Sequence, residues 1–237
     1  MSQPAYSRIL LKLSGEILSG DQEYGIDPIK ASNLANEIKD VHQMGIGIAL
    51  VIGAGNIFRG IKAASKGMDR VTGDYLGMLA TIMNAISIQD ALEKLDVETR
   101  TLSAITVTQI SEPYIRRRAL RHLEKNRVVI VAGGTGNPYF TTDTAAALRA
   151  TELKAEILLK ATKVNGVFDK DPELNQDAKH YKQITYSDVI SKNLRIMDMT
   201  AITLCKENDL PIRVFDVNQK GNLKDILSGK ELGTIIS

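Results

Sequence analysis

The sequence has a single cysteine, no tryptophan and few aromatic residues of any kind. With Cys205 alone, no disulfide can form within the chain. This is typical of proteins kept in a reducing compartment, so we expect a cytoplasmic location. Long apolar runs are also missing, and none reaches the roughly 18 residues that cross a bilayer. We therefore predict neither a membrane-spanning helix nor a membrane partner, and residues 1–7 lack the layout of a secretory signal.

An excess of either charge is absent as well. The 30 lysines and arginines nearly balance the 28 aspartates and glutamates, for a net charge of +2. Such a balance gives no support for a nucleic-acid partner. The dense basic cluster of Arg116, Arg117, Arg118 and Arg121 is interpreted as a solvated helix face. The three histidines are scattered, so we predict no metal ion held by protein side chains.

Short apolar runs alternate with helical patterns along the whole chain. The runs are mostly continuous, which indicates strands covered on both faces; they lie at residues 9–13, 46–52, 99–103, 127–131, 156–160, 212–216 and 234–236. Helices are expected from Asp27, a capping residue followed by proline, and over residues 69–95, 114–125, 142–153, 198–208 and 222–228. This order predicts an α/β fold, a three-layer αβα sandwich around a largely parallel sheet. We expect one domain over residues 1–237, weakly divided near residue 155.

Two early strands end in segments suited to phosphates, and ligands gather at the carboxyl ends of strands in such a sheet. Lys12 must carry its ammonium to the strand end or find an anion, and the amides of the following Ser14-Gly15 turn can face a phosphate. The next strand ends in Gly53-Ala54-Gly55-Asn56. Arg59, just beyond, can hold a phosphate through two hydrogen bonds. Each segment alone has a simpler explanation, a solvent-reaching lysine or a surface arginine.

Two later strand ends carry the same chemistry. Residues 133–143 hold three glycines, an Asn-Pro turn and two threonines at a helix start, where anions bind, with helix capping as the alternative role of Asp143. After residues 156–160 come Lys163, the Asn165-Gly166 turn and Phe168, a ring that a purine could cover. The joint occurrence at four strand ends is far more specific than any one segment, although Walker A, dinucleotide-binding and protein-kinase motifs are absent.

These segments resemble a known family. The motifs KLSGE at 12–16, VIGAGNIFRG at 51–60, GDYLGMLAT at 73–81, GTGNPYFTTD at 134–143 and KATKVNGVFDKDP at 160–172 are similar, in order and spacing, to bacterial uridylate kinases of the amino acid kinase superfamily. The resemblance runs from about residue 8 to residue 236. It departs at Ala54, where the family usually has a third glycine, which threatens binding if that backbone needs a positive φ.

The resemblance implies an amino acid kinase-like fold, with an acceptor-binding part over about residues 1–155 and an ATP-binding part over about residues 156–237. It implies ATP contacts by Lys12, Leu13, Ser14, Gly15, Gly55, Arg59, Thr162, Asn165, Phe168 and Asp171. It implies UMP contacts by Ala54, Asp74, Thr135, Gly136, Asn137, Pro138, Tyr139, Phe140, Thr141 and Thr142. Lys12, Arg59 and Asp143 form the implied catalytic set, in which Lys12 stabilises the transferred group and Asp143 organises the lysines.

The implied reaction moves the γ-phosphate of ATP onto UMP, giving UDP and ADP in pyrimidine nucleotide biosynthesis. The UMP phosphate is ionised at neutral pH, so no general base is required and the work is positioning and charge stabilisation. Magnesium would be carried by the nucleotide phosphates. Two alternatives stay open: a kinase acting on a carboxylate, such as acetylglutamate or aspartate, and a nucleotide-binding storage or regulatory relative without turnover.

The family further implies a homohexamer, inhibition by UTP and activation by GTP, the last through a segment similar to Gly20, Asp21, Gln22, Glu23, Tyr24 and Gly25. The residues themselves also favour an oligomer. Residues 76–89 contain no charged side chain, and a helix apolar on most faces must be buried on most of them. Half could pack on the sheet and half on a second subunit, whereas a wholly internal helix is the alternative.

Overall fold

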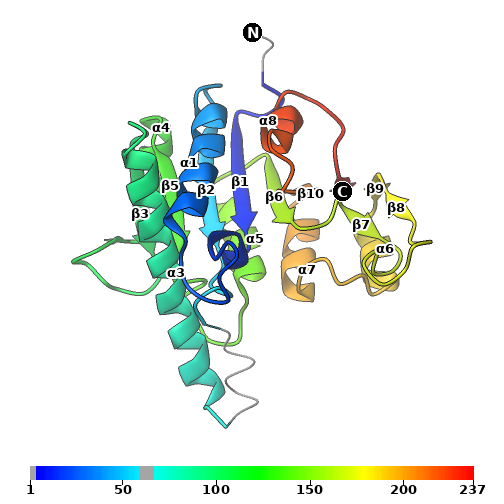
Figure 1. The fold of residues 1–237 in the computed structure, drawn as a ribbon, viewed down its shortest axis with the longest axis horizontal. Helices are drawn as coiled ribbons and strands as arrows, with labels where there is room; N and C mark the ends of the chain where they lie inside the picture. Colours follow the sequence, from blue (N-terminus) through cyan, green and yellow to red (C-terminus); the bar gives the residue numbers. More distant parts are fainter. Residues whose placement is uncertain (1–3, 59–66) are drawn as a thin grey trace.

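The computed structural model describes residues 4–58 and 67–237 (Figure 1), and its centre is a sheet of nine strands. These are β1 (Arg8–Leu13), β2 (Gly47–Ile52), β3 (Thr99–Ser103), β4 (Glu112–Pro113), β5 (Val128–Ala132), β6 (Ile157–Thr162), β9 (Gln183–Ile184), β10 (Ile212–Asp216) and β11 (Thr234–Ile236). Their order is β4-β3-β5-β2-β1-β6-β10-β11-β9. All neighbours pair in parallel except β10 and β11, which are antiparallel.

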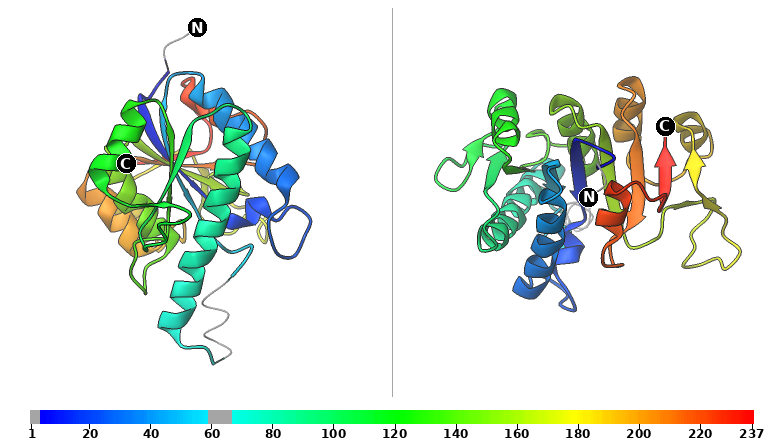
Figure 2. Two further views of the ribbon diagram at one scale, coloured as in Figure 1. Left: turned by 90° about the vertical axis from the view of Figure 1, so that its left-hand side faces the viewer. Right: turned by 90° about the horizontal axis from the view of Figure 1, so that it is seen from above.

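Helices cover both faces of the sheet (Figure 2). One face carries α1 (Pro28–His42), α3 (Arg70–Glu93) and α8 (Asn222–Leu227), and the other carries α4 (Arg116–Glu124), α5 (Thr142–Glu152), α6 (Tyr186–Ser191) and α7 (Met199–Glu207). A 3-10 helix, η1 (Gly15–Leu18), follows β1, and a small antiparallel sheet pairs β7 (Val167–Phe168) with β8 (His180–Tyr181). The predicted three-layer sandwich is therefore confirmed.

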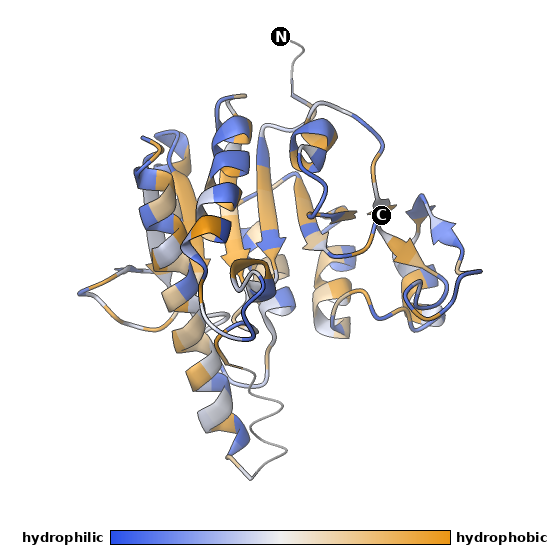
Figure 3. Cartoon of the chain, in the orientation of Figure 1, coloured by the Kyte–Doolittle hydropathy of each residue, from blue (hydrophilic) through white to orange (hydrophobic). Residues whose placement is uncertain are grey.

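Strand β1 shows why the sheet needs helices on both sides. Ile9, Leu11 and Leu13 belong to the apolar core shared with α1 and α3, whereas Leu10 belongs to the core shared with α5 and α7. Successive side chains of a strand point to opposite faces, so a continuous apolar run must be covered twice. The central strands are accordingly hydrophobic along most of their length in Figure 3.

The predicted strands and helices are all present, with small shifts at their ends, and the missed elements are short. Strands β4, β7, β8 and β9 have two residues each, too few to produce a periodic pattern. Helix α6 has six residues. A threonine followed three residues later by an aspartate is a capping pattern that could have predicted its start. In the structure the Thr185 hydroxyl accepts from the Asp188 amide at 3.1 Å and donates to the Asp188 carboxylate.

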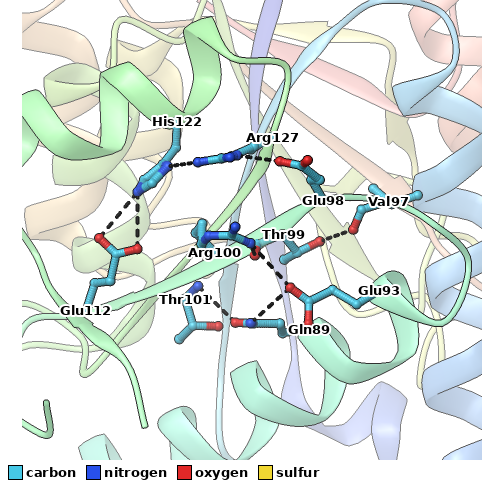
Figure 4. A network of polar contacts seen from close by, with 10 residues as sticks. All are labelled: Gln89, Glu93, Val97, Glu98, Thr99, Arg100, Thr101, Glu112, His122 and Arg127. Atoms are coloured by element: carbon cyan, nitrogen blue, oxygen red, sulfur yellow. Dashed lines mark hydrogen bonds and ion pairs between the residues drawn. The ribbon is translucent and has the colours of Figure 1, made fainter. Parts of the chain in front are cut away.

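The amino-terminal ends of β3 and β5 are joined by a polar network (Figure 4). Arg127 donates to Glu98 at 2.6 Å and contacts Nδ1 of His122 at 3.3 Å, while Nε2 of His122 lies 3.3 Å from Glu112. A guanidinium can only donate, so Nδ1 accepts and Nε2 carries the proton toward the carboxylate. This network ties α4 to the residues that precede β3 and β5 and to β4 at the edge of the sheet.

Helix α3 is buried on one side and exposed on the other. Ile82, Ala85 and Ile88 lie in the core, whereas Leu79 and Met83 are 45% and 55% exposed in the single chain. Its N-terminal half projects beyond the carboxyl ends of the strands (Figures 1 and 2). None of the described helices is both long and apolar enough to cross a membrane.

Candidate active site

The four predicted phosphate segments meet because β5, β2, β1 and β6 are consecutive in the sheet and parallel. Their carboxyl ends therefore open at one edge. Gly15 and Gly53 approach so closely there that a Cβ on Gly15 would lie 2.3 Å from Oδ1 of Asn56 and 2.4 Å from the Gly53 carbonyl oxygen. A glycine at position 15 is thus required by this close approach of two turns.

A buried ion cluster joins Lys12 of β1, Lys160 of β6 and Asp143 of α5. The Asp143 carboxylate contacts the Lys12 ammonium at 2.6 Å and the Lys160 ammonium at 2.8 Å, and all three side chains are at most 15% exposed. Lys160 also donates to the Ile196 carbonyl oxygen. Capping is not the role of Asp143, because Thr141 caps α5 by accepting from the amides of Asp143 and Thr144. One carboxylate therefore balances two cations from two strands.

The groups of the ion cluster shift one another's pKa values. Burial acts to raise the pKa of the Asp143 carboxyl, but the Lys12 and Lys160 ammonium groups outweigh burial and hold that pKa below its ordinary value. Burial lowers the pKa of the Lys160 ammonium, which Asp143 opposes and Lys12 reinforces. At neutral pH the site thus presents an ionised carboxylate between two closely spaced amines, an arrangement that favours an incoming anion.

Several residues of the glycine segment after β5 adopt the left-handed backbone conformation, with positive φ. Gly133, Gly134 and Gly136 have φ of +76°, +61° and +84°, and Tyr139 has φ of 72°, a conformation that bulky residues rarely adopt. The Tyr139 amide donates to the Asp74 carboxylate at 2.7 Å, which helps to hold this turn. Ala54 is not among the described residues with positive φ, so an alanine fits there without backbone strain.

Asp74 lies in the second turn of α3 and joins that helix to the glycine segment. Both of its carboxylate oxygens accept from Nε of Arg70 at 2.9 Å, in addition to the Tyr139 amide. The helix cap is Asp69, which accepts from the Thr72 amide at 2.9 Å. Asp74 is therefore not the residue that caps α3. Its remaining lone pairs are available to a hydroxyl ligand.

A cavity of about 970 Å³ opens beside the ion cluster. Of the residues expected to bind ATP, those on its wall are Lys12, Leu13, Ser14, Thr162, Phe168 and Asp171. Gly15, Gly55 and Asn165 are not part of this wall, nor are the residues expected to bind UMP. Arg59 lies outside the described residues. The cavity suits a nucleotide placed over β1, β6 and β10, and the glycine turns after β2 and β5 form a separate neighbouring surface.

Sequence reasoning missed the segment before α7. Asp198 accepts from the Thr144 hydroxyl at 2.8 Å and from the Thr141 hydroxyl, and it caps α7 through the Ala201 amide at 2.9 Å. Arg195 lines the cavity and forms no ion pair with the described residues. The cap of α7 was visible as a helix start. The contacts of Asp198 with α5 were not, because they join residues more than fifty positions apart.

The loop of residues 20–25 is tied to the turn after β2. The Gly25 amide donates to the Asn56 carbonyl oxygen at 2.7 Å, and the Asn56 side chain donates back to the Gly25 carbonyl oxygen at 2.8 Å. Gly20, at the other end of the loop, lies on the cavity wall. A conformational change in this loop can therefore alter both the wall of the cavity and the turn after β2.

The fold of this chain matches that of known proteins. A family model described as the amino acid kinase family matches residues 7–216. A UMP kinase structure from Bacillus anthracis is 38% identical, with a TM-score of 0.95 over 98% of this chain and 96% of that one. One from Ureaplasma parvum is 38% identical, with a TM-score of 0.92 over 98% and 99%. A uridylate kinase from Archaeoglobus fulgidus is 26% identical, with a TM-score of 0.75 over 97% and 99%.

The ion cluster makes a prediction about stability. Asp143→Asn removes the one carboxylate between two buried cations and should lower the free energy of unfolding by about 3 kcal/mol at neutral pH. The folded pKa of Asp143 is depressed, so its contribution is present above about pH 4 and is lost as pH falls through that pKa. Urea unfolding at fixed protein concentration should show the difference between wild type and variant shrinking as pH falls below about 4, the ordinary pKa of an aspartate.

Asp177→Asn is the matched control. Asp177 pairs with Lys170 at 2.6 Å, but the two side chains are 80% and 39% exposed, so its loss should change the free energy of unfolding by less than about 1 kcal/mol. Equal, small effects of the two substitutions would show that the ion cluster does not stabilise the fold.

Proposed function

The chain belongs to the amino acid kinase family, and from that premise we propose that it is a uridylate kinase, which transfers the γ-phosphate of ATP to the phosphate of UMP. The observation that carries the proposal is the Lys12–Asp143–Lys160 cluster, which lies between a nucleotide-sized cavity and two glycine turns. Two UMP kinase structures that match nearly the whole chain support the choice of acceptor. They favour UMP over acetylglutamate, aspartate or a storage role.

The two substrates divide the site between them in this proposal. ATP occupies the cavity, with its base against Phe168 and Asp171 and its phosphates at Lys12 and the Ser14-Gly15 turn. UMP lies across the turns after β2 and β5, with its ribose toward Asp74. The proposed acceptor part covers about residues 1–155 and the proposed ATP part about residues 156–237.

The reaction needs little covalent work from the protein. A phosphate oxygen of UMP attacks the γ-phosphorus of ATP in line, a new P–O bond forms, and the bond to the β-phosphate oxygen breaks, leaving ADP. The acceptor oxygen is ionised at neutral pH, so no base has to remove a proton. Lys12 and the glycine amides stabilise the charge that spreads over the transferred group, and Asp143 holds the lysines in place.

Magnesium fits this site through the substrates rather than through a protein cage. Within the described part of the chain, no three His, Cys, Asp or Glu side chains are grouped to hold a metal ion, and Asp143 is already engaged by two lysines. Magnesium prefers oxygen ligands and keeps several waters. It would therefore be carried by the nucleotide phosphates and supply charge neutralisation there.

Regulation by nucleotides is proposed as well. The loop of residues 20–25 is bonded to Asn56, so GTP acting through this loop would alter the neighbouring phosphate turn and raise activity. UTP resembles the product and would inhibit.

We also propose a cytoplasmic location. It is supported by Cys205, whose thiol is buried and whose pKa is raised to about 12 by burial, so it stays a protonated packing residue.

An assay of ADP release tests the proposal directly. Wild-type protein with ATP and magnesium should release ADP when UMP is added, and not when acetylglutamate or aspartate is added. Lys12→Ala should reduce kcat by about 100-fold or more while UMP still binds, because it removes a charge that stabilises the transition state. Turnover of a carboxylate instead of UMP, or no turnover at all, would contradict the function. Near-normal turnover of the variant would contradict the role of Lys12.

The Asp74 carboxylate should distinguish UMP from dUMP. Hydrogen bonds to a charged acceptor contribute about 1.5–3 kcal/mol each, so loss of the 2′ hydroxyl should reduce kcat/KM roughly 10- to 150-fold. Asp74→Ala should reduce UMP turnover much more than dUMP turnover, which brings their ratio toward one. If Asp74 only anchors the Tyr139 amide, both substrates will lose activity equally and the ratio will stay unchanged.

The exposed side of α3 supports a homo-oligomer, and we propose a hexamer on the family resemblance. The large apolar side chains on this side are Tyr75, Leu76, Leu79, Met83 and Ile86, each at least 36% exposed in the single chain. Contiguous apolar surface of this kind usually marks an interface. The same helix of a second subunit can cover it by two-fold pairing.

Sedimentation tests the oligomer. Wild-type protein at micromolar concentration should sediment as an oligomer, and Met83→Glu should shift it toward smaller species because a charge in an apolar interface is poorly solvated. Ser32→Glu, at an exposed position of α1, is the control and should leave the oligomer intact. A monomeric wild-type protein would contradict the proposal.

A further inference from the structure

We infer that Thr81 and Asn84 are positioning residues of the acceptor site, which hold the two glycine turns from the inner side of α3. The inference rests on the proposed function, because it concerns where the acceptor phosphate and nucleoside are held. Neither side chain lines the cavity proposed for ATP. Both are buried, at 3% and 0% exposure.

Thr81 anchors the turn after β5. Its hydroxyl donates to the Met78 carbonyl oxygen at 2.7 Å and accepts from the Gly133 amide at 2.8 Å. Gly133 begins the left-handed glycine segment and is itself packed against Ser103 and Ala104. The Thr81 hydroxyl therefore determines the point at which this segment leaves the strand.

Asn84 anchors the turn after β2 through a buried amide pair. Its side chain donates to the Gly53 carbonyl oxygen at 2.7 Å and to Oδ1 of Asn56 at 2.8 Å, and Nδ2 of Asn56 donates back at 3.0 Å. The Asn56 side chain also donates to the Gly25 carbonyl oxygen. Each amide group is thus satisfied on both sides, and such a network fixes a single arrangement of the backbone around it.

Three polar side chains act together along α3. Asp74, Thr81 and Asn84 are spaced seven and three residues apart, which places them on one side of the helix. They bond to Tyr139, Gly133 and Gly53, respectively. A single rigid helix thus holds both turns of the acceptor site in register. The apolar Leu79 and Met83 on its other side do not take part.

Thr81→Val and Thr81→Ser separate positioning from packing. Valine has nearly the shape of threonine but leaves the Gly133 amide without its acceptor, and small displacements of a substrate-holding group are costly. We expect Thr81→Val to reduce kcat/KM for UMP at least about 10-fold and to leave the ATP dissociation constant, measured by calorimetry, unchanged. Thr81→Ser keeps the hydroxyl and should behave as wild type. Thr151→Val, which removes a 3.0 Å bond to Ala147 within α5, is the control and should leave both constants unchanged.

Amide hydrogen exchange tests the same anchoring without any substrate. Thr81→Val should speed exchange in the peptide covering residues 133–140, whereas Asn84→Asp should speed it in the peptide covering residues 53–58. Asn36→Asp is the control for the second change, since the one side-chain hydrogen bond that Asn36 forms with the described residues goes to the Ser32 carbonyl oxygen, at 2.8 Å on the exposed side of α1. Thermal melts identify any variant that fails to fold, and Thr81→Val carries the test if Asn84→Asp is such a variant.

The outcomes distinguish this inference from the proposed function. Absence of UMP turnover by the wild-type protein would overturn the function, and the exchange rates would still decide the anchoring. Unchanged exchange and unchanged UMP kinetics in folded Thr81→Val would overturn the inference. An equal loss of ATP and UMP affinity would also overturn it, because that result indicates a general loss of structure.

Discussion

Most features of the site depend on one interaction, the pairing of the Asp143 carboxylate with the ammonium groups of Lys12 and Lys160. Two cations buried side by side repel each other, and burial penalises both. A single carboxylate at the start of α5 makes their closeness tolerable. The cluster keeps its cations fixed before any nucleotide arrives, so little reorganisation is needed when negative charge develops on a transferred phosphate.

The surrounding fold brings these groups together from distant parts of the chain. Lys12 comes from β1, Lys160 from β6 and Asp143 from the helix between β5 and β6. Because β1 lies between β2 and β6, the two lysines stand on neighbouring strands and pair in register. The glycine turns of β2 and β5 then lie on one side of the cluster and the cavity on the other. In the proposed function these are the places of the two nucleotides.

Much of this could be anticipated from local patterns. Continuous apolar strands, the Asp27-Pro28 cap and glycine-rich strand ends identified the sandwich and the edge on which the site forms. Sequence reasoning failed where the pattern was short or ambiguous. The two-residue strands left no periodicity, and an acidic residue near a helix start, such as Asp143, could equally have been a cap. The cap of that helix is in fact Thr141.

The sequence by itself determined the elements, their order and the chemistry at each strand end, because propensity, periodicity and turn residues act over a few neighbours. Only the tertiary structure decided the partners. It paired Asp143 with two lysines, placed Asp198 against α5 and turned Thr81 and Asn84 of α3 toward the glycine turns. These contacts join residues far apart in the chain, and their strength comes from burial, which no local pattern specifies.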